Sequence, residues 1–295
     1  MASETGSADT HSAGTRNGIV LFTSDRGIAP ATLAKAAEDR GFDTIYVPEH
    51  THIPVRRDAL HPTGGEDLPD DRYLRTLDPW VSLATAAAVT ERIGLSTAVA
   101  LPVESDPITL AKTIATLDHL SDGRVTIGAG FGWNTDELTD HHVPADKRRT
   151  VLAEYLAAMR ALWTEEEASF DGEFVSFGPS WAYPKPPQGR VPVVIGAGGG
   201  PKTMTWIARH ADGWMTTPIE TDIAAKAEVL RGEWADAGRD GEPDVRILVA
   251  KKPTKEDYAD WFAAGPSELI WGVPDSSESE VLTYLDTLAS RLGLS

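Results

Sequence analysis

The sequence predicts an α/β fold of the (β/α)8 (TIM) barrel type. Short β-branched runs alternate with helical patterns along most of the chain, which has 295 residues, of which 41% are hydrophobic. Barrels of about 250 residues form one domain around one core, so this length suits a single barrel. A doubly wound sheet is the alternative, because the order of strands in a sheet cannot be read from sequence.

Composition divides the chain into a tail and one domain. Residues 1–16 are rich in Ser, Thr, Gly and Ala and have no apolar period, which is typical of a disordered tail. Residues 17–295 form the expected barrel domain. Within it we expect strands at residues 18–23, 44–47, 93–100, 124–128, 191–195, 213–216, 245–249 and 268–271.

Helical patterns occupy most of the intervals between these strands. Asp78-Pro79 and Asp106-Pro107 combine a capping carboxylate with a proline suited to a first helical turn. Thr254 and Asp257 have the spacing of a capping box. Strands that alternate with capped helices favour the closed barrel over other α/β arrangements.

Two connections are too long for simple turns. Residues 52–75 follow the second strand, and residues 164–190 precede the fifth. Loops of that length usually cover an active site or are partly disordered. The first of them carries Arg56, Arg57, His61 and Tyr73, which are candidates for substrate contact, although a solvated polar loop is the alternative.

Composition also narrows the classes of function. The chain has no cysteine, which excludes disulfides, thiolate metal sites and a cysteine nucleophile, so redox chemistry requires a bound cofactor. A formal charge of -18 argues against nucleic acid or anionic membrane as partners and leaves a small-molecule substrate. We expect a cytoplasmic protein, because no apolar run is long enough for a signal peptide or a membrane span.

The expected active site lies at the carboxyl ends of the strands, as in other barrel enzymes. The second strand ends in Glu49 and His50. An imidazole there can give or take a proton near neutral pH, beside a carboxylate that tunes it. A purely structural imidazole is the alternative.

Two glycine-rich turns follow later strands. Gly196, Ala197, Gly198, Gly199 and Gly200 precede a helix, which is the outline of a phosphate-binding turn, although tight packing alone would also select glycine. The second turn, after the fourth strand, is GAGFGWN and contains Gly130, Trp133 and Asn134. Its small residues suit either an aromatic ring lying on the backbone or a crowded barrel rim.

Together these segments resemble the bacterial-luciferase-like superfamily, in particular its branch of F420-dependent oxidoreductases. The resemblance runs from about Gly18 to Asp275. Its strongest pieces are GFDTIYVPEH, RIGLSTAVALP, DPITLAKTIATLDHLSDGRVTIGAGFGWN and FDGEFVSFGPSWAYPKPPQGRVPVVIGAGGGPKTMTWIARHADGW. The order and spacing of these pieces are more specific than any single glycine turn.

The resemblance implies roles for individual residues. His50 matches the family's active-site histidine, and Ala98-Val99, next to Thr97, matches a non-prolyl cis peptide beneath the cofactor ring. The tract from Gly196 to Gly200 matches the segment that holds the cofactor phosphate. The resemblance further suggests a homodimer.

Two positions differ from the sugar-phosphate dehydrogenases of this branch. Those enzymes carry Asp where this chain has Glu49, and a glutamate acid near the position of Trp133. Asp136 and Glu137 follow closely, but the resemblance does not transfer the acid role to them. Sugar-phosphate oxidation is therefore not the expected activity.

The sequence thus predicts an oxidoreductase that transfers a hydride between C5 of coenzyme F420 and a small organic substrate, with His50 handling a proton. The main alternative is a monooxygenase that uses reduced FMN and O2. A metal-dependent hydrolase, suggested by His50, His52 and Asp275, is less favoured, because the middle strands end in residues that do not bind metals, and no metal is expected. A barrel that binds flavin without catalysis is a further alternative.

Overall fold

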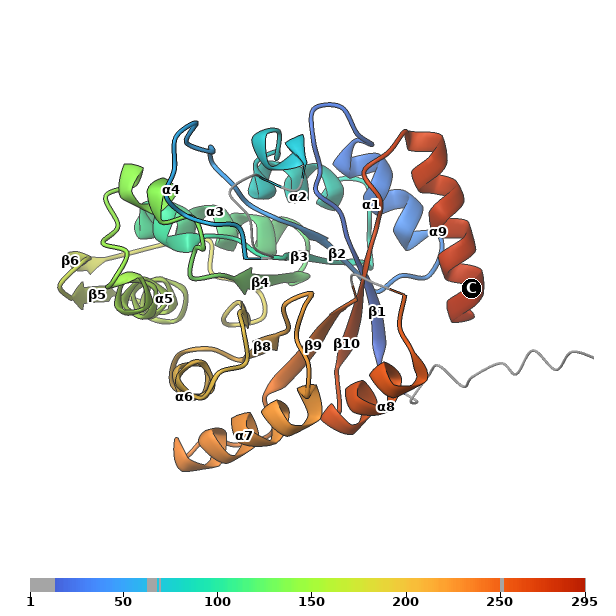
Figure 1. Ribbon diagram of the computed structural model, residues 1–295. Helices are drawn as coiled ribbons and strands as arrows, with labels where there is room; N and C mark the ends of the chain where they lie inside the picture. Colours follow the sequence, from blue (N-terminus) through green and yellow to red (C-terminus); the bar gives the residue numbers. More distant parts are fainter. Residues whose placement is uncertain (1–13, 63–67, 69, 250–251, 295) are drawn as a thin grey trace, which may run out of the picture.

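The computed structural model describes residues 14–62, 68, 70–249 and 252–294 (Figure 1). Eight parallel strands close into a barrel in the order β1-β10-β9-β8-β7-β4-β3-β2, which confirms the predicted fold class. The barrel strands are β1 (Arg16–Val20), β2 (Thr44–Val47), β3 (Gly94–Thr97), β4 (Val125–Ala129), β7 (Val193–Gly196), β8 (Gly213–Met215), β9 (Asp244–Val249) and β10 (Glu268–Gly272).

All eight expected strands form, with shifts of a few residues at their ends. β2 has the expected bounds, whereas β1 begins at Arg16, inside the expected tail, where Arg16 pairs with Glu268 of β10. β3 ends at Thr97, three residues before the expected end, and the cis Ala98-Val99 bond follows directly. Residues 1–13 of the expected tail lie outside the described residues.

Helices surround the barrel on its outer side (Figure 1). Their caps follow the predicted pattern: Asp78 accepts a hydrogen bond from Val81 N at 2.8 Å, and Thr254 and Asp257 form a capping box. The helices are α1 (Pro30–Glu38), α2 (Pro79–Ala87), α3 (Pro107–Leu120), α4 (Thr135–Asp140), α5 (Arg148–Thr164), α6 (Pro201–His210), α7 (Ile223–Asp236), α8 (Lys255–Ala264) and α9 (Glu278–Leu292), with 3-10 turns η1 (Asp71–Leu74) and η2 (Pro102–Glu104).

The long connection before the fifth barrel strand is not an open loop, which corrects the expectation. It contains an antiparallel hairpin of β5 (Ala168–Asp171) and β6 (Ser176–Ser180). The Glu154 carboxylate of α5 accepts hydrogen bonds from three backbone N–H groups of the hairpin turn, at residues 173–175. The turn is thereby fixed to α5.

The barrel interior has a polar end and an apolar middle. At the amino ends of the strands, Arg246 donates to the Tyr46 hydroxyl at 2.8 Å, and that hydroxyl donates to Glu268 Oε2 at 2.6 Å. These three side chains are buried. The Tyr46 ring also belongs to the apolar cluster of the interior, with Val20, Val194, Met215 and Ile270, on which Ala98 and Val99 pack. The opposite end of the barrel carries the candidate site.

Candidate active site

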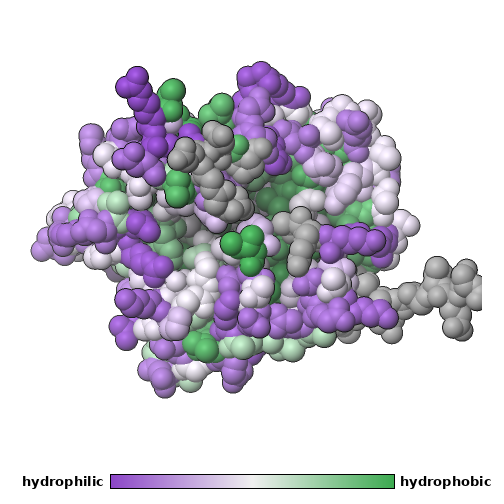
Figure 2. Space-filling view, in the orientation of Figure 1, coloured by the Kyte–Doolittle hydropathy of each residue, from purple (hydrophilic) through white to green (hydrophobic). Residues whose placement is uncertain are grey.

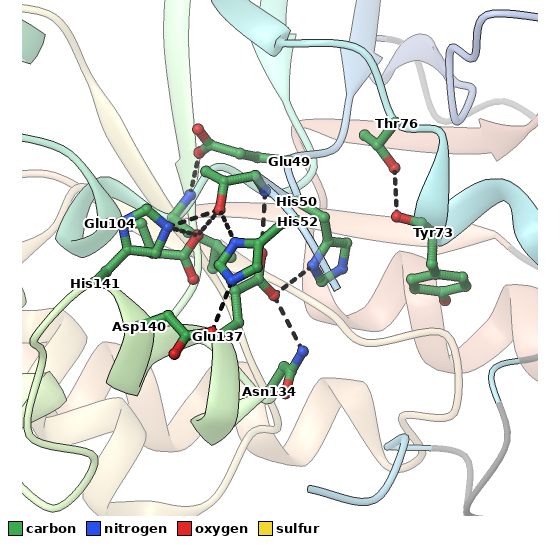
Figure 3. A network of polar contacts seen from close by, with 12 residues as sticks. Glu49, His50, His52, Tyr73, Thr76, Glu104, Asn134, Glu137, Asp140 and His141 are labelled. Atoms are coloured by element: carbon green, nitrogen blue, oxygen red, sulfur yellow. Dashed lines mark hydrogen bonds and ion pairs between the residues drawn. The ribbon is translucent and has the colours of Figure 1, made fainter. Parts of the chain in front are cut away.

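His50 lies at the carboxyl end of β2, held by a carboxylate from a different segment. Its Nδ1 lies 2.9 Å from Glu137 Oε2 of α4, and the two side chains are 7% and 0% exposed (Figure 3). Glu137 also accepts from Thr51 N at 3.0 Å and from Asn134 Nδ2 at 3.3 Å. Among the described residues, His50 Nε2 has no hydrogen-bond partner.

Two further carboxyl groups are buried near this pair. Glu49 Oε2 accepts from Leu101 N at 2.6 Å, and burial raises the pKa of Glu49 to about 7. Burial, together with the charges of Glu137 and Glu49, raises the pKa of Glu104 to about 9. At neutral pH the Glu104 carboxyl therefore holds its proton.

The Ala98-Val99 peptide bond is cis, as expected. Val99 O accepts a hydrogen bond from Glu49 N at 3.0 Å, which links this segment to the strand end that carries His50. A Cβ added at Gly130 would lie 2.6 Å from Val99 Cγ2, and one at Gly196 would lie 2.4 Å from Val99 Cγ1. Glycine at the ends of β4 and β7 thus makes room for the Val99 side chain.

Thr97 does not face the site. Its side chain is fully buried, and its hydroxyl donates to Gly128 O at 2.8 Å and accepts from Gly128 N at 3.1 Å. The hydroxyl is therefore satisfied within the ladder of β3 and β4. Thr97 precedes the Ala98-Val99 segment, and its role in cofactor binding stays a prediction.

Aromatic rings form one wall of the site. The Trp133 ring lies 5.7 Å from the His50 ring and 5.2 Å from the His61 ring, and His61 Nε2 lies 2.9 Å from the Tyr73 hydroxyl. Asn134 is 2% exposed, and its Oδ1 is buried without a partner among the described residues. The loop after β2 therefore meets the turn after β4, a contact that the sequence did not predict.

The glycine tract after β7 leads into the amino end of α6, where Gly200 is the N-cap residue. One of its amides already binds an anionic group: Gly199 N donates to Glu220 Oε2 at 3.0 Å. Glu220 in turn forms an ion pair with Lys226. The tract thus binds a carboxylate in this structure, which is the behaviour expected of an anion site.

The predicted site residues therefore converge on one end of the barrel. Glu49 and His50 follow β2, Ala98 and Val99 follow β3, Gly130 follows β4, and the glycine tract follows β7. The face shown in Figure 2 is hollowed near its centre, with apolar side chains in the hollow.

Sequence reasoning gave no role to Glu137 or Glu104. Glu137 lies 87 positions after His50, and only the position of α4 beside the end of β2 brings the two together. The available signal was weak, because Glu137 lies eight residues beyond the last residue of β4, in the first turn of a short helix. Glu104 gave no signal, because it follows Pro102 in an otherwise apolar run.

No described helix is long and apolar enough to cross a membrane. Within the described ranges, no group of three or more His, Asp or Glu side chains is arranged to hold a metal ion. The histidines of the suggested metal pair have separate carboxylate partners: His50 pairs with Glu137, and His52 pairs with Asp140.

Comparisons with known proteins identify the family of the chain. Residues 23–266 match the family described as luciferase-like monooxygenase. An uncharacterized protein of Mycobacterium tuberculosis, Rv0953c, is 62% identical over 276 residues, which are 93% of this chain and 98% of that protein. An F420-dependent glucose-6-phosphate dehydrogenase of Nakamurella multipartita is 33% identical over 190 residues, 63% of this chain and 51% of that enzyme, so the chain spans about half of it.

Among solved structures, monooxygenase RslO1 of Streptomyces bottropensis has the same fold, with a TM-score of 0.74 at 23% identity, over 94% of this chain and 98% of that one. The family match, the relatives and the barrel lead to one conclusion. The chain belongs to the luciferase-like monooxygenase family and is an oxidoreductase.

Proposed function

We propose that this chain is an F420-dependent oxidoreductase that moves a hydride between a small organic substrate and the deazaflavin, with His50 as proton acceptor and donor. The observation that carries the proposal is the His50–Glu137 pair at the barrel mouth. When Glu137 Oε2 accepts Nδ1–H, the lone pair of the ring lies on Nε2, the nitrogen without a described partner.

When bound, the deazaflavin accepts or delivers a hydride at C5. In the oxidising direction, the substrate carbon loses a hydride, its hydroxyl proton passes to His50 Nε2, and a carbonyl forms. Glu137 stabilises the resulting imidazolium, as an ionised carboxylate does for a buried histidine. In the reducing direction the same proton returns from His50 to the carbonyl oxygen.

The residues at the mouth suit a ring with a phosphate tail. The Val99 side chain would lie beneath the ring, and Gly130 and Gly196 leave the space that this side chain fills. Among the described residues, the buried Asn134 Oδ1 has no hydrogen-bond partner, and a ring N–H would supply one. The amides around Gly198 to Gly200, at the amino end of α6, suit a phosphate. To bind there, the phosphate displaces the Glu220 carboxylate from Gly199 N.

A monooxygenase that uses reduced FMN is the second candidate. The family is named for monooxygenases, and FMN also carries a phosphate that would suit the glycine tract. In that reaction His50 would stabilise an oxygen-derived group instead of a substrate hydroxyl. The two candidates differ in cofactor and in the need for O2.

Native mass spectrometry with F420 and with FMN, followed by turnover assays, tests the proposal. We expect a stoichiometric F420 complex and substrate-dependent change of F420 absorbance without O2 consumption. His50→Asn should keep F420 binding and lose turnover, whereas His119→Asn, at an exposed position of α3, should keep both.

Stoichiometric FMN binding with O2 consumption would instead support the monooxygenase. Binding of either cofactor with unchanged rates in His50→Asn would indicate a barrel in which His50 has no chemical role. Failure of both cofactors to bind would refute both candidates.

A further inference from the structure

A row of polar side chains leads from His50 to the protein surface (Figure 3). Its inner end is the buried pair of His50 and Glu137. Its outer end is the contact of His52 Nε2 with Asp140 Oδ2 at 3.0 Å, where the two side chains are 42% and 59% exposed. The row therefore joins the candidate base to the solvent.

Glu104 and Thr51 fill the middle of the row. The Glu104 carboxyl contacts that of Glu137, and Thr51 Oγ1 lies 3.4 Å from Glu104 Oε2. The same hydroxyl lies 2.7 Å from His141 Nε2 and 3.0 Å from His52 Nδ1. A hydroxyl both donates and accepts hydrogen bonds, so it can pass a proton between these neighbours.

A purely structural role does not explain why a second carboxyl group, that of Glu104, is buried near Glu137. Both Glu104 and Glu137 have fully buried side chains, and within the described part of the chain neither forms an ion pair with Lys or Arg. Glu104 Oε1 is buried and has no hydrogen-bond partner among the residues that the structure describes. An apolar residue at position 104 would avoid this desolvation cost.

We propose that the row from Glu137 through Glu104 and Thr51 to His141, His52 and Asp140 carries the proton between His50 and the solvent. This inference rests on the proposed function, because it requires a base that gains or loses one proton in each turnover. Glu104 and Thr51 act through His50, so they are positioning residues in this scheme.

The steps balance in protons. When His50 Nε2 takes the substrate proton, the ring first becomes the imidazolium that Glu137 stabilises, and its Nδ1–H bond then breaks as that proton passes to Glu137. The carboxyl pair then carries one proton too many, and Glu104 releases one to the Thr51 hydroxyl as that hydroxyl gives its own to His141 or His52. From His52 Nε2 the proton reaches Asp140 and water. The His50 ring is then neutral with its proton on Nε2, and exchange of that proton from Nε2 to Nδ1, with no net gain or loss, restores the acceptor before the next turnover.

Further titratable and charged groups face the row. Glu49 and Glu137 both act on Glu104, and other titratable groups lie against the inner and outer ends. These groups are Asp78 beside Glu49, His61 beside His50, Arg57 beside His61, and His142 beside His141.

Hydrogen exchange in the cofactor-free protein tests the row without relying on turnover. NMR measures how fast the His50 Nδ1 proton exchanges with water in wild type, Glu104→Gln and Thr51→Val. We expect exchange to slow by about tenfold or more in both variants, because each breaks the row at one point. Glu228→Gln and Thr287→Val, at exposed helical positions, should leave the exchange rate unchanged.

Single-turnover experiments give the second readout. A pH-indicator dye follows proton release while F420 absorbance follows hydride transfer. In Glu104→Gln we expect proton release to lag behind hydride transfer at low buffer concentration, and added imidazole to abolish the lag. If Glu104→Gln does not fold, Thr51→Val decides, because Thr51 is exposed.

The outcomes separate the row from the proposed function. Unchanged exchange and no lag in folded variants would overturn the row and leave the F420 activity standing. Slowed exchange in a protein that never turns over F420 would support the row as a path to His50 and refute the F420 proposal.

Discussion

At the scale of single residues, the proposed chemistry requires that the two ring nitrogens of His50 have different surroundings. Glu137 holds Nδ1, and Nε2 has no hydrogen-bond partner among the described residues. The sequence indicated His50 from its position at a strand end. It could not indicate Glu137, because that contact depends on how α4 packs beside β2, not on any local pattern.

Replacing Glu137 with Gln removes the charge that supports a protonated His50 while keeping the size of the side chain. We expect kcat to fall by about 10²-fold or more, with a smaller effect on KM, since the charge matters most as the proton moves. Steady-state kinetics of F420 turnover measure this. Glu137→Asp should recover part of the loss, and equal kcat in wild type and Glu137→Gln would contradict the assigned role.

Glu104 should make the fold less stable as the pH rises. Burial and nearby charges raise the pKa of its carboxyl to about 9 in the folded state, from an ordinary value of 4.5. Its contribution to stability is therefore fully present below about pH 4.5 and is lost as the pH rises toward 9. Urea unfolding at several pH values should show a smaller alkaline loss in Glu104→Gln than in wild type. Parallel curves would show that Glu104 does not titrate this way.

At the scale of elements, turns and caps decide what the mouth can hold. The strands followed from β-branched runs, and the capping residues followed from Asp-Pro and Thr-Asp spacing. The hairpin of β5 and β6 could not be predicted from the sequence, because its strands are short and mostly exposed. The Glu154 carboxylate that fixes its turn comes from α5. Such a long-range anchor has no local sequence pattern.

Gly196 is a position where there is no room for a side chain. Alanine there would place its Cβ 2.4 Å from Val99 Cγ1, and overpacking of this kind costs about 1–3 kcal/mol of unfolding free energy. We expect Gly196→Ala to lower stability and weaken cofactor binding, and Val99→Ala to restore stability in the double variant. Gly178→Ala in β6, where an added Cβ meets nothing within 4 Å, is the control. Equal stability of Gly196→Ala and Gly178→Ala would argue against the packing described.

Glu220 competes for the anion site at the amino end of α6. Its carboxylate occupies Gly199 N and pairs with Lys226. Glu220→Gln removes a negative charge and frees the lysine, so we expect F420 and FMN to bind about tenfold more tightly, most clearly at low salt. Isothermal titration calorimetry measures this, with Glu228→Gln as the control. Weaker binding in Glu220→Gln would mean that the phosphate lies elsewhere.

At the scale of the whole molecule, the barrel places a buried polar cluster that stabilises the fold at one end and the candidate site at the other. Buried Arg246, Tyr46 and Glu268 close the amino end, and the candidate site occupies the other end. The closed barrel was predictable because eight strands alternate with helices. The hydrogen bond between Tyr46 and Glu268 could not be predicted, because these residues are 222 positions apart in the chain.

Arg246 tests this separation. Arg246→Met removes the buried cation beside Glu268 and leaves only the half-exposed Arg16 near that carboxylate, which should lower the unfolding free energy by about 3–5 kcal/mol. Cofactor affinity of the folded fraction should stay the same, because the site lies at the other end. Arg209→Met, at an exposed position of α6, should change neither quantity. Lost affinity at full folding would show that the two ends are coupled.

A crystal structure of the protein with bound F420 would decide whether the cofactor lies at the barrel mouth and faces His50. We expect the phosphate on the amides around Gly198 to Gly200, and the ring on Val99 with its reactive carbon facing His50 Nε2. A phosphate bound away from α6, or a ring that does not reach His50, would contradict the account.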